Sequence, residues 1–342
     1  MPTSNLHPTL GRGATLLAVL ACAGLDTTAP SGRTFDLRTG YVLVANQQSA
    51  NVSLIDLRTD SARLIPVPPG PHEAVISPSG GVGVVTIYGG QGVLGNQLVV
   101  VDIRTGTVSK TISLGEYTRP HGAVFLPGDE TRVVVTSEAT QRLLLVNLAS
   151  GTVEHAIPTN ASGSHMVAVT ADAKRAFTAN VGSGSVSEID LVTRNLVRVI
   201  AVAPNAEGIA VAPDGSTVWA GSNANGTVSV IDTRTGSIAA TLTGFTLPYR
   251  LAISADGRTA IICDPQGNKI HVADVAQRSI TWTLDALGSP RGVNIAPDGK
   301  TAFVTLAADQ TVGIIDLESR RLVRKIKVGA SPDGVWYGPT PR

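Results

Sequence analysis

The sequence has few charged residues, few aromatic residues and only two cysteines. Charged residues make up 15% of its 342 residues, and 27 basic residues oppose 26 acidic ones. A net charge of +1 provides no electrostatic basis for binding nucleic acid, so we expect no nucleic-acid partner. The chain also lacks a G-x-S-x-G elbow, a CxxC pair, a CxxCH haem motif and a phosphate-binding loop. No catalytic residue is therefore predicted from a known motif.

The two cysteines have different surroundings. Cys263 lies in the apolar segment TAIICD (259–264) and is expected to be a buried, unreactive thiol. Cys22 ends the segment VLAC (19–22), which resembles a bacterial lipobox. If Cys22 carries a lipid, no partner is left for a disulfide, and the fold depends on its apolar core.

The first forty residues differ in composition from the rest of the chain. The apolar run before Cys22 is too short to cross a bilayer but is typical of a signal-peptide core. We predict a signal peptide with a lipobox-like cleavage site over residues 1–22, lipidation of Cys22, and a flexible tether over residues 23–40. The alternatives are a plain secretory signal or a misassigned start. The prediction places the protein outside the cytoplasm, at a bacterial cell envelope, with the lipid anchor as its only membrane contact.

What the sequence has in abundance is glycine, proline and repetition. The unit at 208–244, GIAVAPDGSTVWAGSNANGTVSVIDTRTGSIAATLTG, recurs at 292–329. The acidic or amide residue of its VID-like step recurs at intervals of 46, 45, 43, 42, 42 and 42 residues, at Asp56, Asp102, Asn147, Asp190, Asp232, Asp274 and Asp316. The chain therefore contains seven copies of a unit of just over forty residues.

Each unit predicts one four-stranded antiparallel sheet. It has four short segments of alternating apolar and polar residues, separated by turn sequences such as PDG and TRTG. Seven such sheets bury their faces when they pack radially, so we predict an all-β, seven-bladed β-propeller over residues 41–338, with a tail at 339–342. Segment 41–46 matches a second strand and segment 331–338 a first strand, so the two ends should share one blade and close the ring. A linear solenoid is the alternative.

The repeat GTVSVIDTRTGSIAATLTG, flanked by P-x-G and PDG, resembles the YVTN-type β-propeller repeat family. The resemblance covers about residues 41–338. It implies that the first strand of each blade lines a central channel. The family includes surface and periplasmic proteins of unassigned function, and propellers of similar build include lactonases, lyases and the copper-bearing domain of nitrous oxide reductase. The fold therefore says little about activity.

One position in each repeat gathers polar residues at the expected channel mouth. It directly precedes the first strand, and in ring order it holds Asp333, His72, His121, His165, Glu207, Tyr249 and Arg291. Imidazole and carboxylate groups are ligands for divalent transition metals. The candidate ligands for such a metal cofactor are His72, His121, His165 and Glu207. Arg291, Tyr249 and Asp333 are the expected ligand-binding residues, with Arg291 suited to a carboxylate or phosphate. The alternative is that the histidines are ordinary occupants of a P-x-G turn, bonded to a neighbouring loop or to water.

The second repeat carries an insertion, YGGQGVLGN (88–96), with Tyr88 at its base. We expect it on the same face as the histidines, where Tyr88 could contact a ligand and the loop could act as a lid; a tolerated surface insertion is the alternative.

Two functions remain open from the sequence. The first is a non-catalytic binding or scaffold module that holds a protein or small-molecule ligand on its loop-bearing face. The second is a metal-dependent lyase or hydrolase with its site at the channel mouth. A lactonase-like activity has no support beyond the fold.

Overall fold

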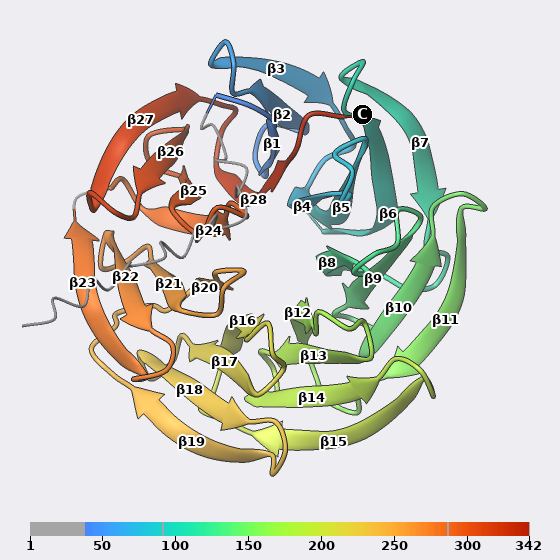
Figure 1. Ribbon diagram of the computed structural model, residues 1–342. Coiled ribbons are helices and arrows are strands. Elements are labelled where there is room, and N and C mark those ends of the chain that lie inside the picture. The colour runs from blue at the N-terminus through green and yellow to red at the C-terminus, as the bar shows by residue number, and fades with distance from the viewer. Residues whose placement is uncertain (1–37, 91, 286, 342) are drawn as a thin grey trace, which may run out of the picture. The chain divides into compact units, whose positions relative to one another are not determined.

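The computed structural model describes residues 38–90, 92–285 and 287–341, and in these ranges it forms seven four-stranded antiparallel sheets around a central axis (Figure 1). From the inner to the outer strand, the blades are β28 (Pro332–Gly338), β1 (Tyr41–Asn46), β2 (Asn51–Asp56), β3 (Ser61–Pro66); β4 (Pro71–Ile76), β5 (Val82–Gly90), β6 (Val93–Asp102), β7 (Thr107–Ser113); β8 (Pro120–Phe125), β9 (Arg132–Ser137), β10 (Arg142–Asn147), β11 (Thr152–Pro158); β12 (Ser164–Val169), β13 (Arg175–Asn180), β14 (Ser185–Asp190), β15 (Asn195–Ala201); β16 (Ala206–Val211), β17 (Thr217–Ser222), β18 (Thr227–Asp232), β19 (Ser237–Leu242); β20 (Arg250–Ile253), β21 (Thr259–Asp264), β22 (Lys269–Asp274), β23 (Ser279–Asp285); and β24 (Pro290–Ile295), β25 (Thr301–Leu306), β26 (Thr311–Asp316), β27 (Arg321–Lys327).

The ring is closed by the two ends of the chain. The C-terminal strand β28 pairs with β1, with Tyr41 opposite Gly338 and Val42 opposite Tyr337. One blade therefore combines the last strand with the first three, so the ends are held by a β-ladder of backbone hydrogen bonds. The predicted all-β, seven-bladed fold and its closure are confirmed, and the linear solenoid is excluded.

The core lies between adjacent blades. One apolar cluster, for example, joins Val84 and Leu98 of the second blade to Val135 and Leu144 of the third. Second strands such as β17 are almost wholly buried, inner strands such as β24 are largely half-buried, and outer strands such as β15 alternate mainly between exposed and half-buried residues. A single blade cannot bury both faces, so the ring stabilises every blade through its neighbours. Cys263 lies in this core on β21, as predicted, and burial raises the pKa of its thiol.

The periodic aspartates close the turn between the third and fourth strands of each blade. Asp190 Oδ1 accepts hydrogen bonds from the backbone N–H groups of Val192 and Thr193, both at 2.8 Å. In the third blade, the amide oxygen of Asn147 accepts the same pair from Ala149 and Ser150. The turn needs only a side-chain oxygen that accepts from the N–H groups two and three residues further along the chain, so asparagine can replace aspartate there.

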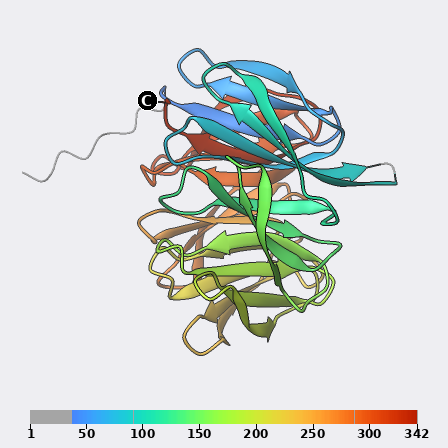
Figure 2. The ribbon, with the colours of Figure 1, turned by 90° about the vertical axis from the view of Figure 1, so that its right-hand side faces the viewer.

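The insertion in the second repeat extends an ordinary hairpin. Strands β5 and β6 continue their pairing beyond the blade, with Gly89 opposite Leu94 and Gly90 opposite Val93. Figure 2 shows this hairpin projecting past the neighbouring loops. It rises from the side of the ring that carries the histidines, because the Tyr88 ring lies 5.3 Å from the His72 ring.

The predicted signal peptide (1–22), its Cys22 and most of the predicted tether lie outside the described residues. Among the residues that are described, no helix has the length and apolar character to cross a membrane.

Candidate functional site

The seven polar positions all lie where an inner strand begins. Six of them are the second residue of their strand, and Tyr249 directly precedes β20. The threonine of the next strand fixes this end: Thr136 Oγ1 accepts from the N–H of Gly122 at 2.9 Å and donates to the carbonyl of His165 in the next blade. Thr305 makes the same bridge between Gly292 and Asp333, and Thr86 accepts from the N–H of Glu73, so a threonine fixes this end in three of the seven blades.

The three histidines form one stack. The His72 and His121 ring centroids are 4.0 Å apart, and those of His121 and His165 are 3.5 Å apart, with interplanar angles of 48° and 33°. Tyr88, at the base of the projecting hairpin, covers the stack, with its ring 5.4 Å from that of His121. His121 is 0% exposed as a result.

His165 is held between two carboxylates. Its Nδ1 lies 2.7 Å from Glu138 Oε2, and its Nε2 lies 2.8 Å from Glu207 Oε1. Burial disfavours the charged ring, but Glu207 and Glu138 outweigh it and raise the pKa of His165 to about 9. At neutral pH His165 is therefore an imidazolium that donates both of its protons to carboxylates.

Arg250 crosses the channel and closes it. Its Nη2 donates to Glu73 Oε1 at 2.7 Å on the far side of the ring, and its Nη1 donates to Glu207 Oε1 at 2.8 Å. Arg250 is 4% exposed. Burial would raise the pKa of Glu207, but His165 and Arg250 outweigh it and lower that pKa to about 2. The same arginine, against the effect of burial, lowers the pKa of Glu73.

Sequence reasoning missed Glu73, Arg250 and Glu138. The P-x-G turn did contain a sequence signal for Glu73 and Arg250. The residue after the polar position is glycine in four blades, at Gly122, Gly208, Gly292 and Gly334, and methionine in one. The two remaining blades carry Glu73 and Arg250, which have opposite charges. Glu138 gave no such signal, since it follows a second strand.

The structure brings the predicted ligand-binding residues to the mouth, where each of them hydrogen-bonds to another side chain of the protein. The Tyr249 hydroxyl donates to Asp333 Oδ2 at 3.3 Å, and the Tyr88 hydroxyl donates to Glu138 at 3.0 Å. Arg291 Nη1 donates to Ser331 Oγ at 3.1 Å. The guanidinium of Arg291 therefore turns toward the loop before β28.

The possible metal donors divide into two groups. Within the described residues, His72, Glu73 and His121 place one donor atom each within 4.8 Å of one another, and so do His121, Glu138 and His165. Glu207, expected as a ligand, belongs to neither group, and its Oε1 is bonded to His165 and Arg250. Burial, together with the nearby charges of His165 and Arg250, lowers the pKa of His121 well below its usual value. His121 is therefore neutral and keeps a lone pair.

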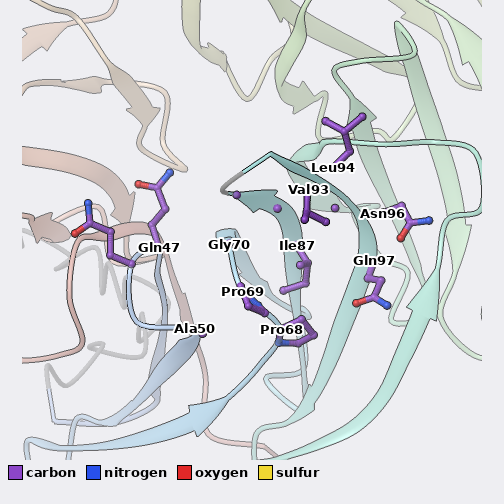
Figure 3. A pocket seen from close by; sticks show the side chains of 14 residues that line it. Gln47, Ala50, Pro68, Pro69, Gly70, Ile87, Val93, Leu94, Asn96 and Gln97 are labelled. Carbon is purple, nitrogen blue, oxygen red and sulfur yellow. The ribbon is translucent and has the colours of Figure 1, made fainter.

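A groove of about 960 Å³ lies beside the hairpin, between the first two blades (Figure 3). Gln47 of the β1–β2 loop borders one side, and Val93 and Leu94 of the hairpin border the other. Pro68 and Pro69 form part of its floor. None of its fourteen lining residues is charged.

Fold and site together define a seven-bladed β-propeller whose channel is closed by buried ion pairs. Residues 254–341 match the family model described as YNCE-like beta-propeller. Among solved structures, a chain of Kuenenia stuttgartiensis hydrazine synthase is similar, with a TM-score of 0.70 at 19% identity over 84% of this chain and 98% of that one. Identity at this level shows the fold alone. A search of curated proteins finds no match. The predicted resemblance to repeat propellers is confirmed by the family model over residues 254–341 and, for the fold, by this structural similarity.

Proposed function

We propose that the protein is a non-catalytic binding module of a bacterial cell envelope that holds an extended, uncharged segment of a partner protein against hairpin β5–β6. The observation that carries the proposal is the exposure of Val93 (70%) and Leu94 (48%) on the projecting hairpin. Among the described residues, they are the only consecutive pair of exposed large apolar side chains. Isolated exposed apolar residues are ordinary. Because successive side chains of a strand point to opposite faces, Val93 and Leu94 give both faces of this hairpin exposed apolar surface beside the groove.

The chemistry of the groove supports a polypeptide as the occupant. Apolar surface from Ile87, Val93 and the two prolines suits apolar side chains, while the amides of Gln47 and Gln97 can bond a peptide backbone. The lack of charged lining residues disfavours ionic ligands, because nothing would replace their hydration.

The channel mouth favours binding over catalysis. A metal-dependent lyase or hydrolase needs a ligand position that substrate can reach. His121 is fully buried beneath Tyr88, and Arg250 is bonded to carboxylates on both sides of the channel. A substrate would have to displace the Tyr88 ring before it could reach His121.

Selection of random linear peptides displayed on phage against the purified protein tests the partner. We expect uncharged, apolar-rich peptides, and we expect Val93→Asp and Leu94→Asp to weaken their binding by more than about 10-fold, since a central apolar contact contributes about 2 kcal/mol. Val323→Asp is the matched control, because Val323 is similarly exposed on outer strand β27. Failure to select peptides, or selection of peptides whose affinity the hairpin variants leave unchanged, would refute the proposed surface.

The envelope location rests on the N-terminal sequence pattern. Because a lipid on Cys22 would be the only membrane attachment, Cys22→Ser should move the protein from the membrane fraction to the soluble fraction. Cys263→Ser is the control, since that thiol is buried in the core and should leave fractionation unchanged. Unchanged membrane association of Cys22→Ser would contradict lipidation.

A further inference from the structure

We propose that His72, His121 and Glu73 bind one divalent transition metal ion at the channel mouth, with Asp333 as the fourth ligand. This site goes beyond the proposed binding function, because the hairpin groove does not need it. The inference rests on unpartnered buried atoms, on their distances and on the local balance of charge.

The first observation is a set of buried polar atoms without hydrogen bonds. Both ring nitrogens of His121 have no partner, and neither do His72 Nδ1 and Asp333 Oδ1. His121 and Asp333 are 0% exposed, so bulk water does not solvate them. Leaving a buried polar atom unsatisfied costs about 1–3 kcal/mol, and such costs at one place call for a bound group.

The second observation is that these donors converge. Donor atoms of His72, Glu73 and His121 lie within 4.8 Å of one another. His72 Nδ1 is also 3.8 Å from both Glu73 Oε1 and Asp333 Oδ2. Ligand atoms around one ion with bonds of about 2.0–2.2 Å lie roughly 3–4 Å apart. The donors of His72, Glu73 and His121 are therefore close to this spacing, whereas Asp333 lies outside their group of three and approaches it through His72.

The third observation is an excess of negative charge. The carboxylates of Glu73, Glu207 and Asp333 surround the guanidinium of Arg250, and the second cation, the imidazolium of His165, is bonded to Glu207. Three carboxylates therefore face two cations, and Glu73 and Asp333 have only Arg250 between them. Arg250 donates to Oε1 of Glu73 through two nitrogens, so the arginine does not use Oε2. A metal cation beside Glu73 and Asp333 would supply positive charge where it is lacking.

The neighbouring group of His121, Glu138 and His165 is the weaker candidate. Both ring nitrogens of His165 already contact carboxylates, at 2.7 and 2.8 Å. A metal at that group would have to break one of these bonds, whereas His72 and His121 have free nitrogens to offer.

The ligand set indicates the class of metal. Two imidazoles and two carboxylates suit zinc and neighbouring divalent transition metals rather than calcium or magnesium, which prefer oxygen ligands alone. Four protein ligands around a buried ion are typical of a closed, structural site. The ion would join the first three blades at the mouth, because Asp333 lies on β28, His72 and Glu73 on β4, and His121 on β8.

The test is metal titration of chelator-treated, purified protein with Zn²⁺ and Co²⁺. We expect one ion per chain, a tetrahedral Co²⁺ absorption spectrum that Zn²⁺ abolishes, and a rise in Tm on binding. His121→Gln and His72→Gln should each weaken binding by at least about 100-fold, since each removes a direct ligand. His165→Gln, which removes the third ring of the stack, and His155→Gln, on outer strand β11, should bind like the wild type.

Three results would overturn the proposal. They are wild-type protein that binds neither ion, His72→Gln and His121→Gln variants that bind normally, and a His165→Gln variant that loses binding while His72→Gln keeps it. If His121→Gln does not fold, as judged by circular dichroism, His72→Gln provides the same test. Peptide binding at the hairpin is measured separately, so failure of one proposal does not affect the other.

Discussion

Replacing Arg250 with methionine is expected to lower the free energy of unfolding by about 3–5 kcal/mol, the usual loss when one partner of a buried ion pair is removed. Arg250 is 4% exposed and holds Glu73 and Glu207 from opposite sides of the channel. Without the guanidinium, Glu73 would remain buried without its cation, and Glu207 would keep only His165. Urea denaturation in the presence of EDTA, followed by circular dichroism, measures the loss.

Two variants make this prediction specific. Arg58→Ala removes an arginine whose side chain is 76% exposed in its pair with Asp56, and it should cost less than about 1 kcal/mol. Combining Arg250→Met with Glu73→Gln also removes the carboxylate that loses its cation, and it leaves the pair of Glu207 and His165 intact, so part of the lost stability should return. A single Arg250→Met variant as stable as Arg58→Ala would show that the channel pairs do not stabilise the ring.

Stability should also fall as the pH rises above neutrality, because His165 is protonated in the folded protein. Its folded pKa is about 9, above the ordinary value of 6.5. Folding therefore favours the protonated ring: the contribution is fully present below about pH 6.5 and is lost as the pH rises through 9. A shift of this size corresponds to roughly 3 kcal/mol. Glu138 and Glu207 favour the charge, while burial and Arg250 oppose it.

The lowered pKa of Glu207 predicts that the free energy of unfolding also declines at acidic pH. Its folded pKa is about 2, below the ordinary 4.5, so its contribution is present above about pH 4.5 and is lost as the pH falls toward 2. Unfolding free energies measured in EDTA from pH 3 to 9.5 should therefore be highest between about pH 4.5 and 6.5.

The control for the loss of stability at high pH is the variant His165→Gln, whose side chain at this position cannot titrate. The difference in stability between wild type and variant should shrink between pH 7 and 9.5, and an NMR titration of the wild type should place the His165 ring near pKa 9. A His165 ring that loses its proton below pH 7 would contradict the two hydrogen bonds by which Glu138 and Glu207 stabilise its charge.

Much of the channel mouth was predictable, because repetition makes each blade a template for the next. The turn before each first strand marked the positions of His72, His121 and His165, and the resemblance to the YVTN-type repeat implied that those strands are innermost. Once the ring closes, equivalent positions meet around one axis. The sequence therefore predicted that these histidines would lie near one another.

The partners of these side chains were not predictable in the same way. His165 contacts Glu138 of the preceding blade and Glu207 of the following one, and Arg250 reaches Glu73 across the channel. The last pair is separated by 177 residues. Which carboxylate binds which cation depends on side-chain rotamers and on the width of the channel, and neither is encoded in a local pattern.

The sequence by itself determined the number of blades, the four strands of each blade and the closure by both ends, because these follow from turn chemistry and a period of two along each strand. The first strands nevertheless begin earlier than expected, since six of the seven polar positions lie inside them. Only the tertiary structure decided that the channel is closed by ion pairs, that Tyr88 covers His121, and that Glu73 rather than Glu207 stands beside the free imidazoles. Those features arise where strands from different blades meet, and the energies involved depend on burial and on distances of a few ångströms.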